Sequence, residues 1–326
     1  MLDSNLPHIR IVVTCKNAER TIGYCLQSIL DLDYPSLNIT VIDGGSTDGT
    51  NEIVETFHNV ELVRGKFTRS QAYNYALRNY YEEIFGLVDA DCVVHPEWAK
   101  TLIKDLSSEN IAAAGGFFTT PEDGNWISKL IGLEFFERTR RFGEFVPRLN
   151  TGNLMFRRSA ALEVGGFDED VKANQDMIFG YKLTEKGYRI KFDPKANIEH
   201  YHRSSFKKYF LQQFSYALDM PTVYSKYPKY IKGDHLTSLL MNLQPIILAC
   251  TVIFALVSLA QPIFFWGTLC FLGILLAIYF GETLRILIQS KDFKALQLPI
   301  IYVVRNIAWT LGGTAYVFRC MWRIRR

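Results

Sequence analysis

Two aspartates, Asp89 and Asp91, directly follow the apolar run 84–88. Side chains two residues apart on an extended segment point to the same side, so these carboxylates converge where a ligand can reach them. Without a counter-charge they would repel each other, and a hard divalent cation bridging to phosphate oxygens would relieve that repulsion. The pair therefore predicts a metal–phosphate site; the simpler alternative is a solvated turn at a strand end.

Polar residues also follow two earlier apolar runs, at residues 9–15 and 38–42. After the second run comes the glycine-rich stretch 44–50, where glycine permits a tight turn and Thr47 or Asp48 can cap a helix. A simple turn would explain this stretch equally well. The polar residues at the two ends are Thr14, Lys16, Asn17, Glu19 and Asp43.

These side chains need elements that bring them together, and the sequence alternates strand and helix patterns. We expect strands at 9–15, 38–42, 60–63 and 84–88, and helices at 21–30, 50–57, 71–80 and 98–106. Such alternation predicts an α/β fold with a mostly parallel sheet covered by helices on both faces. Ligands of such sheets bind beyond the carboxyl ends of the strands. The polar residues listed above should therefore lie at one edge of the sheet.

The order and spacing of these motifs resemble the inverting family 2 glycosyltransferases, which have a GT-A fold. The resemblance rests on residues 12–19, 41–50, 88–91, 150–158, 165–169 and 175–176, and covers roughly residues 8–216. The apolar tail is similar to that of the cellulose-synthase-like and lipid-phosphate-sugar members. The resemblance implies a Rossmann-like GT-A domain followed by a C-terminal helical membrane domain.

The resemblance also implies a donor site. Asp43 would contact the base and Glu19 the ribose or base, although Gly44 stands where the family often has a second acid. Asp89 and Asp91 would hold Mn²⁺ or Mg²⁺ against the diphosphate, with Asp91 as the more direct ligand. We also expect His200 to approach the metal; a strand-end histidine bonded to backbone is an equal alternative. The nucleotide-binding set is Thr14, Lys16, Asn17, Glu19, Asp43 and Asp89.

An inverting transfer needs a general base on the acceptor side and no enzyme nucleophile. The position that the family uses for this base is occupied by Asp176, preceded by Gln175 where the family has Glu. An acceptor phosphate would already be ionised, and Asp176 would then only position it; a further alternative is that Asp176 caps a helix over 177–186.

Gln212 and Tyr216 match part of the Q-x-x-R-W element of processive members, with Ser215 in place of its Arg. The lost Arg argues against processive polymer synthesis and favours transfer of a single sugar. Together with Gln175, we expect Gln212 and Tyr216 to contact the acceptor or the diphosphate.

The 45 residues 237–281 contain no charged residue or histidine. Because about 20 apolar residues cross a bilayer as a helix, we expect two crossings, at 239–259 and 263–280. A third apolar stretch, 296–318, is interrupted by Arg305 and Asn306. We expect it to be interfacial or re-entrant, with a third crossing as the alternative and a lipid phosphate as a suitable partner for Arg305.

The expected domains are a catalytic domain over 1–202, an amphipathic interface segment over 203–236 and a membrane domain over 237–326. Residues 127–146 are a second candidate interface segment. The first 236 residues carry 28 basic and 31 acidic side chains and the remainder 8 and 2, so the net positive charge belongs to the membrane end. The six cysteines have no metal or disulfide spacing, and no signal peptide pattern is visible. We therefore expect an integral membrane protein whose catalytic domain faces the cytoplasm.

The expected activity is transfer of one hexose to a membrane lipid-linked acceptor, such as a polyprenyl phosphate or lipid-linked glycan. GDP-mannose is the first candidate donor and UDP-glucose the second. The alternatives are a processive polysaccharide synthase or a non-catalytic nucleotide-sugar-binding scaffold. A dehydrogenase is excluded because no G-x-G-x-x-G follows the first strand. The net negative charge of the first 236 residues disfavours nucleic acid as a partner.

Overall fold

The computed structural model describes residues 6–324, and its internal contacts divide the chain into two units. The first unit comprises the residues up to 122 together with 142–202, and the second comprises 123–141 together with the residues from 203 onward. This division changes unit after residue 202, and the expected catalytic, interface and membrane domains stay predictions. The segment 123–141, which the expected boundaries assign to the first domain, groups with the second unit instead.

The first unit is built on an eight-stranded mixed sheet with the order β3-β2-β1-β4-β9-β6-β10-β8. The strands β1 to β4 are parallel to one another, as are β6 and β10, whereas β9 is antiparallel to both of its neighbours and β8 is antiparallel to β10. In sheet order the bounds are β3 Val60–Arg64, β2 Leu37–Asp43, β1 Ile9–Cys15, β4 Ile84–Asp89, β9 Asn153–Arg157, β6 Ile111–Gly115, β10 Arg189–Phe192 and β8 Phe145–Val146.

Six helices and a small second sheet complete this unit. The four expected strands and four expected helices are all present, with ends within two residues of the expected ones. The small sheet has the order β5-β11-β7, with bounds Cys92–Val94, Ile198–His200 and Phe118–Thr119. The helices are α1 Ile22–Leu30, α2 Thr50–Glu55, α3 Arg69–Asn79, α4 Trp98–Asp105, α6 Arg158–Glu163 and α7 Gln175–Glu185.

The strand order determines where a ligand can bind. The chain runs outward from β1 through β2 to β3 and then returns to place β4 on the other side of β1. In open α/β sheets, the ligand crevice is found at such a reversal, beyond the carboxyl ends of the two strands, here β1 and β4. The register aligns those ends, because Thr14 pairs with Asp89 and Cys15 pairs with Asp43. Three of the sequence-predicted site residues therefore lie at one level of the sheet.

The second unit is helical, and two helices in its described part are long and apolar enough to cross a membrane. These are α9 (Leu239–Ser258) and α10 (Phe265–Ser290), which pack against each other. Their large apolar side chains, such as Leu256 and Phe280, are exposed, as expected of a lipid-facing surface. The other helices are α5 Trp126–Thr139, α8 Phe206–Lys226 and α11 Leu298–Ile324.

The third apolar stretch forms part of one continuous helix, α11, which is 27 residues long. The helix continues through Arg305 and Asn306. Both side chains are buried inside the second unit. Arg305 Nη1 donates to Glu134 Oε1 at 2.9 Å, and Asn306 Nδ2 donates to Gln244 Oε1 at 2.9 Å. The expected lipid phosphate partner of Arg305 was thus wrong: a carboxylate of α5 takes that role. Whether α11 spans the membrane stays a prediction.

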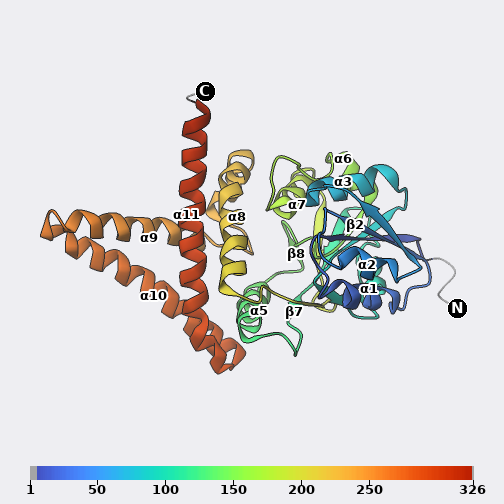
Figure 1. The fold of residues 1–326 in the computed structure, drawn as a ribbon, viewed down its shortest axis with the longest axis horizontal. Coiled ribbons are helices and arrows are strands. Elements are labelled where there is room, and N and C mark those ends of the chain that lie inside the picture. The colour runs from blue at the N-terminus through green and yellow to red at the C-terminus, as the bar shows by residue number, and fades with distance from the viewer. Residues whose placement is uncertain (1–5, 325–326) are drawn as a thin grey trace. The chain divides into compact units, whose positions relative to one another are not determined.

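The helices α8 and α11 pack closely along each other (Figure 1). A Cβ added at Gly312 of α11 would lie 2.7 Å from the carbonyl oxygen of Phe214 and 2.8 Å from the Cβ of Ala217. Only glycine allows the backbones to approach so closely. The Trp309 Nε1 donates to Gln213 Oε1 at 2.9 Å across the same contact, so α8 is packed on α11 in addition to any contact with lipid headgroups.

Candidate active site

The loop after β2 is organised by Asp43, which is buried. Its carboxylate accepts hydrogen bonds from the backbone N–H of Gly45 and Ser46, from the Ser46 hydroxyl and from Asn51 Nδ2. Burial raises the pKa of this carboxyl, but the hydrogen bonds from Ser46, Asn51 and Gly45 outweigh burial and hold the pKa below its ordinary value. Asp43 therefore stays ionised and holds the turn in shape.

The residue after Asp43 has no room for a side chain. A Cβ at Gly44 would lie 2.8 Å from the carbonyl oxygen of Phe67, and the Gly44 N–H donates to the carbonyl oxygen of Cys15 at 2.9 Å. The second acid that the family often carries is thus excluded by the close approach of two backbone segments, the end of β2 and residue 67.

We expect Gly44→Asp to destabilise the protein by about 1–3 kcal/mol, the usual cost of overpacking. The added side chain would have to displace backbone rather than a flexible side chain. Thermal unfolding in detergent measures the loss. Gly143→Asp is the matched control, since nothing lies within 4 Å of a Cβ at that exposed glycine. Equal stability of both variants would contradict the close approach.

The end of β1 is fastened to the same loop by two side chains. Asn17, whose φ is 54°, accepts the Thr47 N–H on its Oδ1 at 2.8 Å. Glu19 Oε2 accepts the Gly49 N–H at 3.1 Å, directly before α2. These bonds join two strand ends that are distant in the sequence. The structure thus gives Asn17 and Glu19 a role in shaping the loop, and their contact with a nucleotide stays a prediction.

The other two residues expected at the end of β1 differ in their surroundings. Thr14 Oγ1 lies 3.5 Å from the hydroxyl of Tyr73, a buried residue of α3, whereas the side chain of Lys16 is exposed. Thr14 therefore packs against α3 at the end of β1, whereas Lys16 is available to solvent or to an anionic ligand.

Asp89 lies at the end of β4, beside the guanidinium of Arg69. Its Oδ2 is 4.0 Å from Arg69 Nη2, and a Cβ at Gly152 would lie 3.0 Å from the same oxygen. Its Oδ1 is buried and has no hydrogen-bond partner among the described residues. A buried carboxylate oxygen without a partner requires an explanation, such as water or an ion.

Asp91 and His200 lie together at the start of the small sheet. Asp91 Oδ1 is 3.4 Å from His200 Nε2, and the Nδ1 of His200 is buried with no hydrogen-bond partner in the described part of the chain. Carboxylate oxygens and imidazole nitrogens are both ligands of divalent cations. The donors present, with the unpartnered oxygen of Asp89, therefore fit a divalent cation. The structure places His200 beside Asp91, and the approach of His200 to a metal stays a prediction.

Asp176 is part-buried in the first turn of α7, and its Oδ1 accepts the N–H of Met177 at 2.9 Å. Burial raises the pKa of Asp176 above its ordinary value and the charge of Asp89 adds to the rise, whereas Arg148 and Arg69 oppose it. Asp89 and Asp176 are thus close enough to influence each other's charge. Gln175, the preceding residue, is buried.

Two expected contact residues belong to the other unit. Gln212 and Tyr216 lie on α8, one turn apart. The expected donor-site residues belong to the first unit, whereas α8 belongs to the second. The expected contact of Gln212 and Tyr216 with the acceptor or the diphosphate therefore stays a prediction.

Sequence reasoning missed Arg69, Arg148 and Cys92. A signal for Arg69 exists, since Thr68 and Gln71 form a capping box that marks the start of α3 directly after β3. Arg148 is buried and electrostatically coupled to Asp176, but nothing in its local sequence indicates this. The sequence gives no reason to single out Cys92, because buried cysteines are common in ordinary protein cores.

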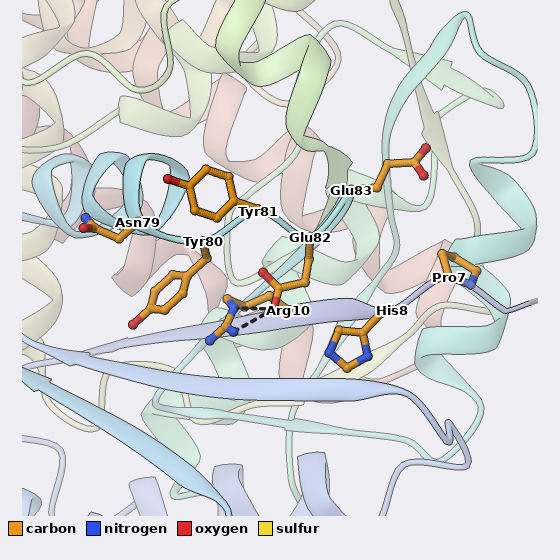
Figure 2. Close-up of a pocket in the computed structure, with 8 residues that line it drawn as sticks. All are labelled: Pro7, His8, Arg10, Asn79, Tyr80, Tyr81, Glu82 and Glu83. Carbon is orange, nitrogen blue, oxygen red and sulfur yellow. Dashed lines mark hydrogen bonds and ion pairs between the residues drawn. The ribbon is translucent and has the colours of Figure 1, made fainter.

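A separate hollow of about 550 Å³ lies at the opposite end of the sheet (Figure 2). It is lined by residues near the amino ends of β1 and β4, including Arg10, Tyr80 and Glu82. Figure 2 shows the Arg10 guanidinium joined to Glu82, to which Nη2 donates at 2.6 Å. The Tyr80 ring lies 3.8 Å from the same guanidinium. The charge of Arg10 is therefore already neutralised by Glu82.

The fold and this site together define a GT-A-type α/β protein with a helical second unit. The structure is similar to that of a mannosyltransferase from Pyrobaculum calidifontis, solved in complex with GDP-Man and Mn²⁺. The TM-score is 0.60 at 20% identity, over 96% of this chain and 88% of that one. At this identity the likeness shows the fold alone.

Residues 10–165 match the family Glycosyl transferase family 2, and this part of the chain is a domain of that family. A glycosyltransferase of Haloferax volcanii, AglE, is 26% identical over 59% of this chain and 66% of its own length. A protein of Methanococcus voltae is 25% identical over 90% of this chain and 92% of its own length. That protein is a dolichyl N-acetyl-α-D-glucosaminyl phosphate 3-β-D-2,3-diacetamido-2,3-dideoxy-β-D-glucuronosyltransferase. The poly-β-1,6-N-acetyl-D-glucosamine synthase of Staphylococcus epidermidis is 26% identical over 58% of this chain, which spans only 48% of the length of that relative.

Proposed function

We propose that the protein is an inverting, metal-dependent glycosyltransferase that moves a single hexose from a nucleotide-diphosphate sugar to a lipid-linked acceptor. The observation that carries the proposal is the charged group at the end of β4, where Asp89 has a buried oxygen without a hydrogen-bond partner among the described residues and lies 4.0 Å from Arg69. The charge of Asp89 also acts on Asp176. The two carboxylates come from different elements, β4 and α7. One is suited to the donor diphosphate and the other to the acceptor.

On the donor side, Asp91, Asp89 and His200 would hold Mn²⁺ or Mg²⁺. The bound cation would supply stabilisation of the charge that develops on the departing nucleoside diphosphate. Arg69, 4.0 Å from Asp89, adds a fixed positive charge at the same place. The Arg69 side chain is relevant because Ser215 replaces the arginine that processive members carry. Its presence on α3 supports a diphosphate site that does not depend on that missing residue.

On the acceptor side, Asp176 would take the proton of the attacking hydroxyl as the new glycosidic bond forms. A raised pKa suits this role, because a base is most effective when its pKa approaches the working pH. The buried cation Arg148 opposes this rise in the pKa of Asp176 and so favours the ionised carboxylate. With an acceptor phosphate, which is already ionised, Asp176 would position the acceptor without removing a proton.

The helical unit supports a lipid acceptor. A transferase that carries two membrane-length helices, α9 and α10, is held at the surface where such acceptors reside, and this restriction favours encounter. The Methanococcus voltae relative, which aligns over most of both chains, is named for a dolichyl-phosphate-linked acceptor. We propose the same acceptor class here, with the first unit facing the cytoplasm.

The proposal for the donor sugar rests on similarity to a solved structure. The P. calidifontis structure contains GDP-Man and Mn²⁺, which supports GDP-mannose as the first candidate donor and Mn²⁺ as the first candidate metal. UDP-glucose is the second candidate. Because Gly44 excludes a second acid at the base-contacting motif, base selection would rest on Asp43 and its neighbours.

The test of the function is transfer of radiolabelled sugar from GDP-mannose and UDP-glucose into organic-extractable product, with polyprenyl phosphates supplied in detergent. A labelled lipid that forms only with divalent metal supports the proposal. Label that enters only water-soluble acceptors would reject the lipid acceptor. Thermal stability measured with GDP or UDP, each with and without Mn²⁺, tests the donor site independently, because a bound ligand stabilises the native state.

The raised pKa of Asp176 predicts the acid limb of the pH profile. As pH falls, Asp176 is protonated at a higher pH than an ordinary aspartate, so kcat/KM for a hydroxyl acceptor should decline above the ordinary aspartate range. Arg148→Gln removes a cation that favours the carboxylate and should move this limb to higher pH. Arg148→Lys keeps the charge and should move it much less. A limb that neither variant moves would separate Arg148 from the titration.

A further inference from the structure

Three donor groups of different chemistry meet at the start of β5. A carboxylate oxygen of Asp91, the Sγ of Cys92 and a ring nitrogen of His200 all lie within 4.8 Å of one another. The proposed function uses the carboxylate and the imidazole. It has no role for the thiol, which is buried against them.

The backbone fixes the positions of these groups. Cys92 and His200 are direct partners across the antiparallel strands β5 and β11, and the Tyr201 N–H donates to the carbonyl oxygen of Asp91 at 2.9 Å. The His200 ring packs against Phe118, with the ring centres 5.6 Å apart. Because sheet hydrogen bonds and ring packing position the set, only small side-chain movements are needed to bring the donors onto one ion.

The chemistry of the donors favours a particular ion. Carboxylate, thiolate and imidazole together are a typical ligand set for Zn²⁺, whereas Mg²⁺ and Mn²⁺ favour oxygen ligands. A site of given geometry also binds Zn²⁺ more tightly than Mn²⁺. The extra sulfur ligand therefore makes this corner of the crevice selective for the softer ion.

We propose that Asp91, Cys92 and His200 form a Zn²⁺ site that overlaps the proposed Mn²⁺ or Mg²⁺ site. Zn²⁺ would bind through three donors, and the Cys92 thiol would lose its proton to solvent as the Zn–S bond forms. The ion would displace Mn²⁺, because both would use Asp91 and His200. This second part rests on the proposed function, which assigns those two residues to the activating metal.

The chain offers a matched control for the thiol. Cys25 is also buried, and its Sγ donates to the carbonyl oxygen of Asp89 at 3.5 Å. It lies near the same crevice but outside the three-donor set. Cys25→Ser and Cys92→Ser thus make the same chemical change in similar surroundings.

The experiment uses the full chain in detergent, stripped of metal and titrated with Co²⁺ as a spectroscopic substitute for Zn²⁺. We expect a thiolate-to-cobalt charge-transfer band in the wild type and in Cys25→Ser, and its loss in Cys92→Ser. Zn²⁺ affinity should fall at least about tenfold in Cys92→Ser, because even the loss of an outer-shell partner costs about that much. Mn²⁺ binding, followed by electron paramagnetic resonance, should be retained in Cys92→Ser and should show that this variant is folded.

Addition of Zn²⁺ should release bound Mn²⁺ from the wild type. Absence of the cobalt band from the wild type, or its persistence in Cys92→Ser, would overturn the site. A Mn²⁺ signal that Zn²⁺ leaves unchanged would overturn the overlap. A protein that shows the Cys92-dependent band but transfers no sugar to any acceptor would reject the proposed function and leave the Zn²⁺ site standing.

Discussion

Asp176→Asn should lower kcat for transfer to a hydroxyl acceptor by about 10²–10⁴-fold, the usual contribution of a general base. The amide has nearly the same shape as the carboxylate but cannot accept the proton. Its oxygen can still accept the Met177 N–H, so the start of α7 should remain intact. Steady-state rates at saturating donor, with donor affinity from the thermal shift, measure the effect on each step.

Two comparisons make this result specific. Glu185→Gln, at the exposed opposite end of α7, makes the same chemical change away from the crevice and should leave the rate unchanged. A phosphate acceptor, which needs no base, should lose much less rate in Asp176→Asn than a hydroxyl acceptor. A wild-type rate with both acceptors would exclude Asp176 from the reaction.

Glu134→Ala should destabilise the helical unit by about 3–5 kcal/mol, because removal of one partner leaves a buried charge uncompensated. Glu134 and Arg305 are both almost fully buried. The Glu134 carboxylate binds Arg305 at 2.9 Å and Arg138 at 3.2 Å. Thermal unfolding in detergent should show the loss as a lower transition temperature.

A double variant distinguishes the loss of the ion pair from the cost of a buried charge without a partner. Glu134→Leu with Arg305→Leu replaces the ion pair by apolar groups, and such replacements are often neutral or stabilising. We therefore expect the double variant to be more stable than either single variant. Asp33→Ala, which breaks the exposed pair with Lys100, is the surface control and should change stability little. A double variant as unstable as the sum of both single changes would show that the pair does not act as a unit.

The first half of the first unit could be predicted from the sequence because its patterns are local. Short apolar runs followed by amphipathic stretches define β1 to β4 and α1 to α4, and the structure confirms each of them. The later strands carry no comparable pattern. For example, β6 at 111–115 consists mainly of small residues, and its pairing with β10 joins segments far apart in the chain. The antiparallel β9 between β4 and β6 was likewise a product of tertiary pairing.

The site divides in the same way. Asp89 and Asp91 were identifiable because their spacing and their place after a strand are local features. Arg69 and Arg148 were not, because their contribution depends on where α3 and the segment before β9 fold. The same holds for the thiol of Cys92, which gains meaning only when β11 brings His200 beside it.

By itself the sequence determined the alternation of strands and helices, the carboxylates at the strand ends and the two apolar helices. All of these features depend on periodicity and composition within one segment, so neighbouring residues are enough to predict them. Only the tertiary structure decided that β4 returns to the other side of β1, that Arg305 is neutralised by Glu134 and that 123–141 belongs to the helical unit. These features depend on contacts between distant segments, where the balance of burial, charge pairing and backbone approach is set by the fold as a whole.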